Sequence, residues 1–163
     1  RRIKKRKRII KPTIMKKIVY VDMDGVIANF KKAADEEAAK AGVPKLTRPD
    51  LKVNFRDLDL MPGAQDALMK LNNDFDIFIA TTPPWSRPDV WAHKREWIEE
   101  HFPWLKRKMI LTHRKDLLIG DILIDDSRWR GQPDFQGAWL WFGTAQRCKD
   151  WPSTLELIYK RYA

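Results

Sequence analysis

Residues 18–25 read IVYVDMDG, and this stretch decides the fold that the sequence predicts. Its first half, Ile18–Val21, is short and rich in β-branched and aromatic residues, which is typical of a strand buried on both faces. Its second half places Asp22 and Asp24 directly after that strand, followed by Gly25. We therefore expect a buried strand whose carboxyl end carries an acidic pair.

Four more short apolar runs predict four more strands. They cover residues 75–80, 109–111, 122–124 and 138–142. Apolar residues recur at helical spacing in stretches that start near Phe30, Ala64 and Val90, and residues 153–156 (STLE) form a capping box that predicts a last helix. Strands that alternate with helices imply right-handed crossovers and a mainly parallel sheet covered on both faces. The sequence therefore predicts an α/β fold in three layers.

The interval 43–61 differs from the rest of the chain. It reads VPKLTRPDLKVNFRDLDLM, with weak periodicity and mixed charge, and it lies between the first predicted helix and a Pro-Gly turn. We interpret it as part of a small helical cap, residues 28–61, inserted after the first strand. Residues 15–163 then form a single domain that includes this cap.

Polar residues follow four of the five predicted strands. In an open parallel sheet, ligands bind beyond the carboxyl ends of the strands, so these residues should converge at one edge. Repulsion among clustered carboxylates is relieved by a divalent cation, and hard oxygen ligands suit Mg²⁺. We expect Asp22 and Asp125 to bind Mg²⁺ through their carboxylates and Asp24 through its backbone carbonyl. The alternative is that each aspartate merely caps a helix or begins a turn.

Lys94 lies on the apolar stripe of a predicted helix, between Val90 and Trp97. A lysine that faces inward is costly unless it meets an anion. Directed at the strand ends, Lys94 would neutralise a carboxylate and bind a substrate phosphate. The alternative is that it extends along the helix surface to reach solvent.

The formal net charge of +10 belongs mainly to the N-terminus. Residues 1–14 hold eight basic residues and no acid, which leaves 24 basic against 22 acidic residues in the rest of the chain. A basic tail can bind nucleic acid or act as a localisation signal. The alternative is a solvated extension or a leader encoded by an expression vector, because residues 15–18 (MKKI) resemble a natural start.

Composition excludes several classes of protein. No uncharged stretch approaches the ~20 residues that span a bilayer, so we expect no membrane partner. A single cysteine, Cys148, cannot form an internal disulfide, which favours the cytoplasm. The three histidines are too scattered to indicate zinc, and the eight tryptophans suit packing roles, except that Trp85 could border the site.

Four motifs occur in order along residues 16–160. They are residues 21–26 (VDMDGV), residues 80–83 (ATTP), Lys94 within residues 93–97 (HKREW), and residues 120–126 (GDILIDD). This pattern resembles the haloacid dehalogenase (HAD) superfamily and, within it, the 5′(3′)-deoxyribonucleotidase family and its bacterial and phage relatives. The resemblance implies a Rossmann-like, HAD-type fold with a small cap.

The resemblance also implies a mechanism of phosphate-monoester hydrolysis. Asp22 would attack phosphorus to give an aspartyl-phosphate, with Mg²⁺ as cofactor. Asp24 would protonate the leaving nucleoside oxygen and then activate water. Phosphoryl oxygens would be held by Thr81, Lys94 and Thr82. Asp126, beside the metal ligand Asp125, would position Lys94 or a metal-bound water.

Substrate contacts are implied for Phe30, His113 and Lys115, with Phe30 lining the nucleoside pocket. His113 stands where members of the family commonly carry Arg, and the cap is shorter than the cap of those members.

The expected substrate is a nucleoside monophosphate, in particular a deoxyribonucleotide. Alternatives are a sugar phosphate, a polynucleotide 3′-phosphate, a nucleic-acid-binding module that uses the basic tail, or a catalytically silent relative. A homodimer is also left open.

Overall fold

The computed structural model describes residues 14–163, and residues 1–13 of the basic tail lie outside the described residues. Five parallel strands form one sheet in the order β3-β2-β1-β4-β5. The strands are β1 (Ile18–Val21), β2 (Asp76–Thr81), β3 (Met109–Leu111), β4 (Ile122–Asp125) and β5 (Ala138–Trp141). Every predicted strand is therefore confirmed to within one residue at each end.

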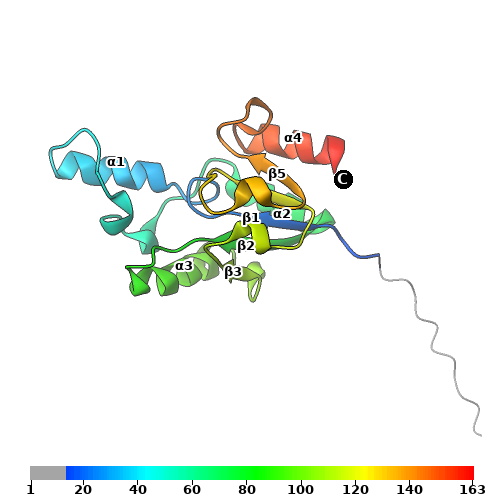
Figure 1. Ribbon diagram of the computed structural model, residues 1–163, viewed down its shortest axis with the longest axis horizontal. Helices are drawn as coiled ribbons and strands as arrows, with labels where there is room; N and C mark the ends of the chain where they lie inside the picture. Colours follow the sequence, from blue (N-terminus) through cyan, green and yellow to red (C-terminus); the bar gives the residue numbers. More distant parts are fainter. Residues whose placement is uncertain (1–13) are drawn as a thin grey trace, which may run out of the picture.

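Alternation along β1 divides the core into two parts. Val19 and Val21 face one side, where they join the larger apolar cluster, whereas Tyr20 faces the other side. The larger cluster also contains residues of α2 (Ala64–Asp74), α3 (Pro88–His101) and α4 (Trp151–Arg161). Figure 1 shows these helices packed around the central strands. The burial of both faces accounts for the continuous apolar sequence of β1.

The second face of the sheet has a thinner cover than the sequence predicts. In the described part of the chain, its apolar cluster is closed by Leu118 and Phe135, which lie next to two 3-10 turns, η4 (Lys115–Leu117) and η5 (Gln132–Asp134). The connections on this side, residues 112–121 and 126–137, barely reach the length of a full helical crossover. The α/β class with a parallel sheet is confirmed, while one outer layer consists of turns.

The start of α4 lies before the predicted capping box. Asp150 is the N-cap residue, and its side chain accepts a hydrogen bond from the backbone N–H of Ser153 at 2.9 Å. Ser153 Oγ in turn accepts a hydrogen bond from the N–H of Asp150 at 3.2 Å. The box thus spans residues 150–153 and not 153–156, because aspartate is as good an N-cap as serine and Pro152 suits the first turn.

Residues 28–61 leave the sheet after β1 and return to the same place. They contain α1 (Phe30–Lys40) and two 3-10 turns, η1 (Pro49–Leu51) and η2 (Phe55–Asp57). The two ends of the segment are joined by hydrogen bonds from Asn29 N–H to the Asp59 carbonyl (2.7 Å) and from Met61 N–H to the Ile27 carbonyl (2.8 Å). Figure 1 shows α1 standing beyond the end of the sheet.

No helix within residues 14–163 combines the length and the apolar character needed to cross a membrane.

Candidate active site

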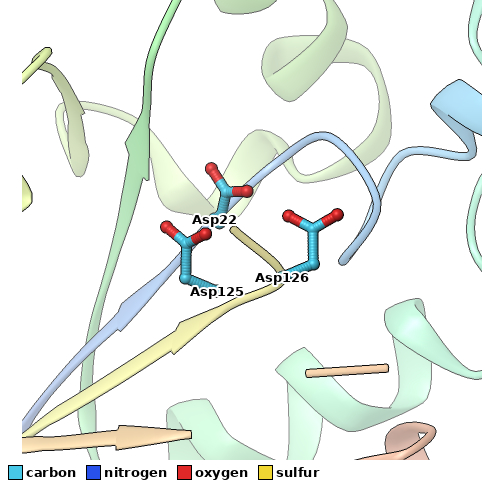
Figure 2. Close-up of side chains that lie close together, drawn as sticks. All are labelled: Asp22, Asp125 and Asp126. Atoms are coloured by element: carbon cyan, nitrogen blue, oxygen red, sulfur yellow. The ribbon is translucent and has the colours of Figure 1, made fainter. Parts of the chain in front are cut away.

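Three carboxylates gather where β1 and β4 end. Asp22, Asp125 and Asp126 each offer an oxygen, and these oxygens lie within 4.8 Å of one another. Figure 2 shows the three side chains turned toward a common space. The parallel register of β1 and β4 produces this meeting, because Val21 lies opposite Ile124 and both strands end at the same edge.

The electrostatics of this cluster fit a divalent cation. Burial and repulsion from Asp22 raise the pKa of Asp125 to about 6, and the same two causes raise the pKa of Asp126 to about 8. Each raised pKa means that the charged form is costly without a positive partner. A set of three hard oxygen donors supplies what Mg²⁺ requires, so the residues present fit that ion.

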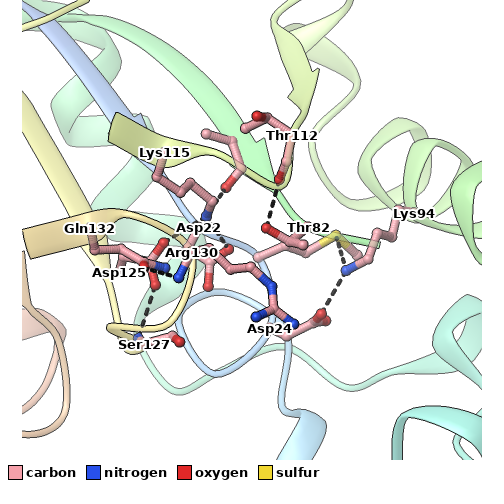
Figure 3. A network of polar contacts seen from close by, with 12 residues as sticks. Asp22, Asp24, Thr82, Lys94, Thr112, Lys115, Asp125, Ser127, Arg130 and Gln132 are labelled. Atoms are coloured by element: carbon pink, nitrogen blue, oxygen red, sulfur yellow. Dashed lines mark hydrogen bonds and ion pairs between the residues drawn. The ribbon is translucent and has the colours of Figure 1, made fainter. Parts of the chain in front are cut away.

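Lys115 is the buried cation of the cluster. Its Nζ lies 3.0 Å from Asp22 Oδ1 and 2.6 Å from Asp125 Oδ2, and it donates to the Ala80 carbonyl at 2.7 Å. Burial alone would lower the pKa of Lys115, but the two carboxylates outweigh burial and raise it. Lys115 therefore stays charged at neutral pH. It comes from η4, which brings it under the end of β1 (Figure 3).

Lys94 neutralises a different carboxylate. It is fully buried on α3, and its Nζ lies 2.6 Å from Asp24 Oδ2. The other oxygen, Asp24 Oδ1, is buried without a hydrogen-bond partner in the described chain. Burial nevertheless raises the pKa of Asp24, against the opposing effect of Lys94. Asp24 thus has one oxygen fixed by Lys94 and one oxygen buried without a partner.

The structure bears on two sequence-based expectations about Lys94. The carboxylate that contacts Lys94 is Asp24 and not Asp126, so for Asp126 the positioning of a metal-bound water is the role that stays a prediction. Lys94 also lines neither of the two cavities described next, whereas Lys115 lines the one that contains Asp22. The apolar stripe correctly predicted a buried lysine beside a carboxylate, but it could not specify which carboxylate.

Two adjoining cavities open at this edge of the sheet. The first, which we call the acidic cavity, has a volume of about 500 Å³ and is lined by Asp22, Lys115, Asp125 and Asp126 among others. The second cavity, of about 670 Å³, is more apolar, and we call it the aromatic cavity. Both volumes are within the usual range for small-ligand sites. Residues that line both cavities are Asp24, Phe30, Thr82 and Arg130.

The two threonines after β2 have different positions. Thr81 is fully buried, its hydroxyl lacks a hydrogen-bond partner among the described residues, and it lines neither cavity. Thr82 lines both cavities, and its hydroxyl donates to the Thr112 carbonyl at 2.7 Å. Thr82 therefore offers a hydroxyl at the cavity walls, while the expected contact of Thr81 with phosphoryl oxygens stays a prediction.

Aromatic side chains line the aromatic cavity. Phe30 packs on Phe55 with ring centroids 5.5 Å apart, and Phe55 is itself a core residue. Trp85 is 80% exposed and packs edge-on against His113. His113 Nε2 donates to the Pro83 carbonyl at 3.1 Å, so this imidazole is held in the wall of the cavity. The sequence-based interpretation of Trp85 as a residue at the border of the site is confirmed geometrically.

No sequence pattern pointed to Arg130 and Gln132, which also line the cavities. They lie on the irregular connection between β4 and β5, where no periodicity indicates which side chains face a cavity. Gln132 is buried and its Oε1 accepts a hydrogen bond from Arg130 N–H at 2.7 Å. The one local hint is Gly131, which has a φ of 87° and marks a tight turn.

Gly25 allows the loop after β1 to pass close to Asp126. Its φ is 81°, and a Cβ at this position would collide with Asp126 Oδ2. We expect Gly25→Ala to lower the free energy of unfolding by about 2–4 kcal/mol, from left-handed strain and overpacking together. Gly42→Ala is the matched control, because Gly42 has a φ of 70° and open space around it. Gly42→Ala should lower the free energy of unfolding, measured with denaturant, by only about 1–2 kcal/mol. Equal losses in Gly25→Ala and Gly42→Ala would contradict the predicted collision.

The parallel five-stranded sheet with its helices defines the class of fold to which the chain belongs, an α/β fold that it shares with a solved HAD-type structure. A crystal structure provisionally described as a HAD hydrolase of Bacillus subtilis, bound to magnesium, superposes with a TM-score of 0.54 at 13% identity. The match covers 82% of this chain and 92% of that one, and it shows a shared fold.

Sequence comparison identifies the family. The family model "5' nucleotidase, deoxy (Pyrimidine), cytosolic type C protein" matches residues 44–149. A protein of Vibrio phage KVP40, provisionally named a 5′(3′)-deoxyribonucleotidase, is 34% identical over 88% of this chain and 85% of its own. The human cytosolic-type 5′(3′)-deoxyribonucleotidase is 34% identical over 71% of this chain and 74% of its own. The chain belongs to the 5′(3′)-deoxyribonucleotidase family, whose named members are phosphoric monoester hydrolases.

Proposed function

We propose that this protein is a Mg²⁺-dependent phosphomonoesterase that acts on nucleoside monophosphates, in particular 5′(3′)-deoxyribonucleotides. The observation that carries the proposal is the position of Asp22, which lies in one cavity beside a buried cation, while Asp24 borders both this cavity and the aromatic one. A phosphoryl group in the first cavity and a nucleoside in the second would place the ester bond between the two aspartates. Membership of the family supports this substrate class.

Mg²⁺ would be held by the carboxylates of Asp22 and Asp125 and by the backbone carbonyl of Asp24, with Asp126 beside them. When bound, it would offset the negative charge of these carboxylates and of the phosphoryl oxygens. Magnesium bound to the HAD neighbour is consistent with this assignment. The pKa of Asp125 is raised even though Lys115 contacts this carboxylate, so a further positive charge would be favourable here.

In the first step, a carboxylate oxygen of Asp22 attacks phosphorus and forms a covalent aspartyl-phosphate. The bond between phosphorus and the nucleoside oxygen breaks, and that oxygen takes a proton from Asp24. In the second step, Asp24 takes a proton from water as the water oxygen attacks phosphorus. The bond to Asp22 then breaks, which releases inorganic phosphate and restores both aspartates.

Other side chains would hold the reacting groups. Lys115 keeps Asp22 in place and lies within the cavity that would hold the phosphoryl oxygens. Thr82 offers a hydroxyl at the boundary of the two cavities. Lys94 acts on the other aspartate, Asp24, and holds its carboxyl group through Oδ2. We propose that residues 28–61 act as a cap, in which Phe30 and Phe55 form an apolar wall for the nucleoside.

Phosphate release from a panel of monophosphates tests the substrate and the metal together. We expect turnover with 5′- and 3′-deoxyribonucleotides when Mg²⁺ is present. Chelation of the metal should reduce turnover by at least about 10³-fold, because the clustered carboxylates then repel the phosphate dianion. Added Mg²⁺ should restore it. Metal-independent turnover would contradict the proposed cofactor.

The same panel separates the rival substrates. A preference for sugar phosphates or for a polynucleotide 3′-phosphate over every mononucleotide would contradict the proposed substrate class while leaving the chemistry intact. A nucleic-acid-binding module would instead show steeply salt-dependent binding that vanishes when residues 1–14 are removed. That binding would persist in chains without the acidic cluster.

A further inference from the structure

We propose that Arg130 is a further catalytic residue whose guanidinium binds the phosphoryl oxygens at the scissile ester bond. The inference deepens the proposed function and rests on it. Arg130 lies on the connection between β4 and β5, outside the four sequence motifs.

The position of Arg130 between the two cavities is the first observation. Only four residues of the described chain line both cavities, and Arg130 is one of them. In the proposed binding mode, the phosphoryl group occupies the acidic cavity and the nucleoside occupies the aromatic cavity. The ester bond then crosses the boundary, so a residue that lines both cavities is placed beside that bond. Asp24, the proposed proton donor to the leaving oxygen, shares this boundary.

The charge of Arg130 is the second observation. The other lysines and arginines that line these cavities are already paired with carboxylates: Lys31 with Asp35, Arg48 with Asp50, and Lys115 with Asp22 and Asp125. Within residues 14–163, Arg130 makes no ion pair, and its side chain donates only to the Trp129 carbonyl, at 3.1 Å. Its guanidinium therefore has donors left for a ligand, in a planar fork that matches phosphoryl oxygens.

The backbone around Arg130 is held in place, which is the third observation. Its N–H donates to the buried Gln132 side chain at 2.7 Å, and its carbonyl accepts a hydrogen bond from the Lys115 N–H at 2.7 Å. The loop is thus tied to the same residue whose Nζ contacts Asp22. Figure 3 shows Arg130 and Lys115 reaching the acidic cluster from these connected segments. The Lys115 ammonium is held in place by its own contacts, and the backbone that carries Arg130 is fixed beside it, so the guanidinium starts from a defined position at the cavity wall.

Arg130 exchanges no proton in this role. It offsets charge on the phosphoryl oxygens while the bond to Asp22 forms and the bond to the nucleoside oxygen breaks. Lys115 is largely neutralised by the two carboxylates that it contacts, so a second and unpaired cation is needed to attract the phosphate dianion.

The test compares Arg130→Ala and Arg130→Lys with Arg128→Ala. Arg128 is the matched control, because it is an exposed arginine two residues away that stacks on Trp129 and Trp141 and lines neither cavity. With a deoxyribonucleotide and Mg²⁺, Arg130→Ala should lower kcat/KM by about 100-fold. Arg130→Lys should recover part of this loss, since it keeps the charge but not the fork. Arg128→Ala should stay within about two-fold of the unaltered protein, because exposed charges distant from the phosphate are screened.

Calorimetric binding of inorganic phosphate, in the presence of Mg²⁺, separates this inference from the proposed function. Phosphate affinity should fall by about ten-fold or more in Arg130→Ala and remain unchanged in Arg128→Ala. Equal phosphate affinities in the three proteins would overturn the role of Arg130 even if the enzyme hydrolyses nucleotides. If the unaltered protein hydrolyses no monophosphate, the proposed function fails, while the phosphate affinities still decide whether Arg130 binds the anion. Equal melting temperatures would confirm that lost affinity does not reflect a lost fold.

Discussion

Asp22→Asn is expected to lower turnover of a deoxyribonucleotide by at least about 10⁴-fold, because an amide cannot serve as the nucleophile. The folded state should tolerate the change. An asparagine oxygen can still accept the hydrogen bond from Lys115, and the neutral amide removes repulsion with Asp125 and Asp126. Initial rates of phosphate release and thermal unfolding, measured on the same preparation, test both statements.

Asp66→Asn is the matched control for this substitution, since Asp66 is an exposed aspartate in the first turn of α2 that lines neither cavity. Its turnover should equal that of the unaltered protein. Brief mixing with ³²P-labelled substrate followed by acid quench should leave label on the unaltered chain and none on Asp22→Asn. Substantial turnover by Asp22→Asn would exclude Asp22 as the nucleophile.

The strands and the acidic edge were predictable because each depends on local pattern. Ile18–Val21 and residues 122–124 are continuous apolar runs, and a parallel sheet brings whatever follows such runs to one edge. The meeting of Asp22 with Asp125 follows from those two facts alone. The register confirms it, with Val21 opposite Ile124.

The sequence also contained the information that tells which of the two threonines, Thr81 or Thr82, is buried. Side chains alternate along a strand, so Thr81 shares the face of Ile77 and Ile79, which belong to the main core. Thr81 is accordingly buried, and the next residue, Thr82, is the one that reaches the cavities. The alternation of side chains along β2 would have predicted that Thr81 is buried and that Thr82 reaches the cavities.

The assignment of the lysines could not be predicted in this way. Lys94 lies on a helix, where spacing indicates that it faces inward, but spacing does not show which carboxylate it meets. Lys115 and Arg130 lie on 3-10 turns or irregular connections that have no periodicity. Their positions depend on long-range contacts, such as the hydrogen bond between the Lys115 N–H and the Arg130 carbonyl. Such contacts exist only once the chain has folded.

Lys115→Met should produce the largest loss of stability in the site. The lysine is 1% exposed, and its removal leaves Asp22, Asp125 and the Ala80 carbonyl without their shared donor. Breaking a buried ion pair from one side costs about 3–5 kcal/mol, because the remaining charge stays buried and uncompensated. Denaturant unfolding without divalent cations should show a loss of this size, and turnover should fall together with it.

Two further variants, compared with Lys115→Met, test this prediction. Lys108→Met removes a lysine that lies 2.5 Å from Asp76 Oδ1, but both partners are partly exposed, so the loss should stay below about 1 kcal/mol. Adding Asp125→Asn to Lys115→Met removes one of the uncompensated charges, so the double variant should be more stable than Lys115→Met alone. The non-additivity of this cycle measures the coupling between the buried partners. If Lys115→Met and Lys108→Met cost the same, Lys115 is not the cation that holds the acidic cluster together.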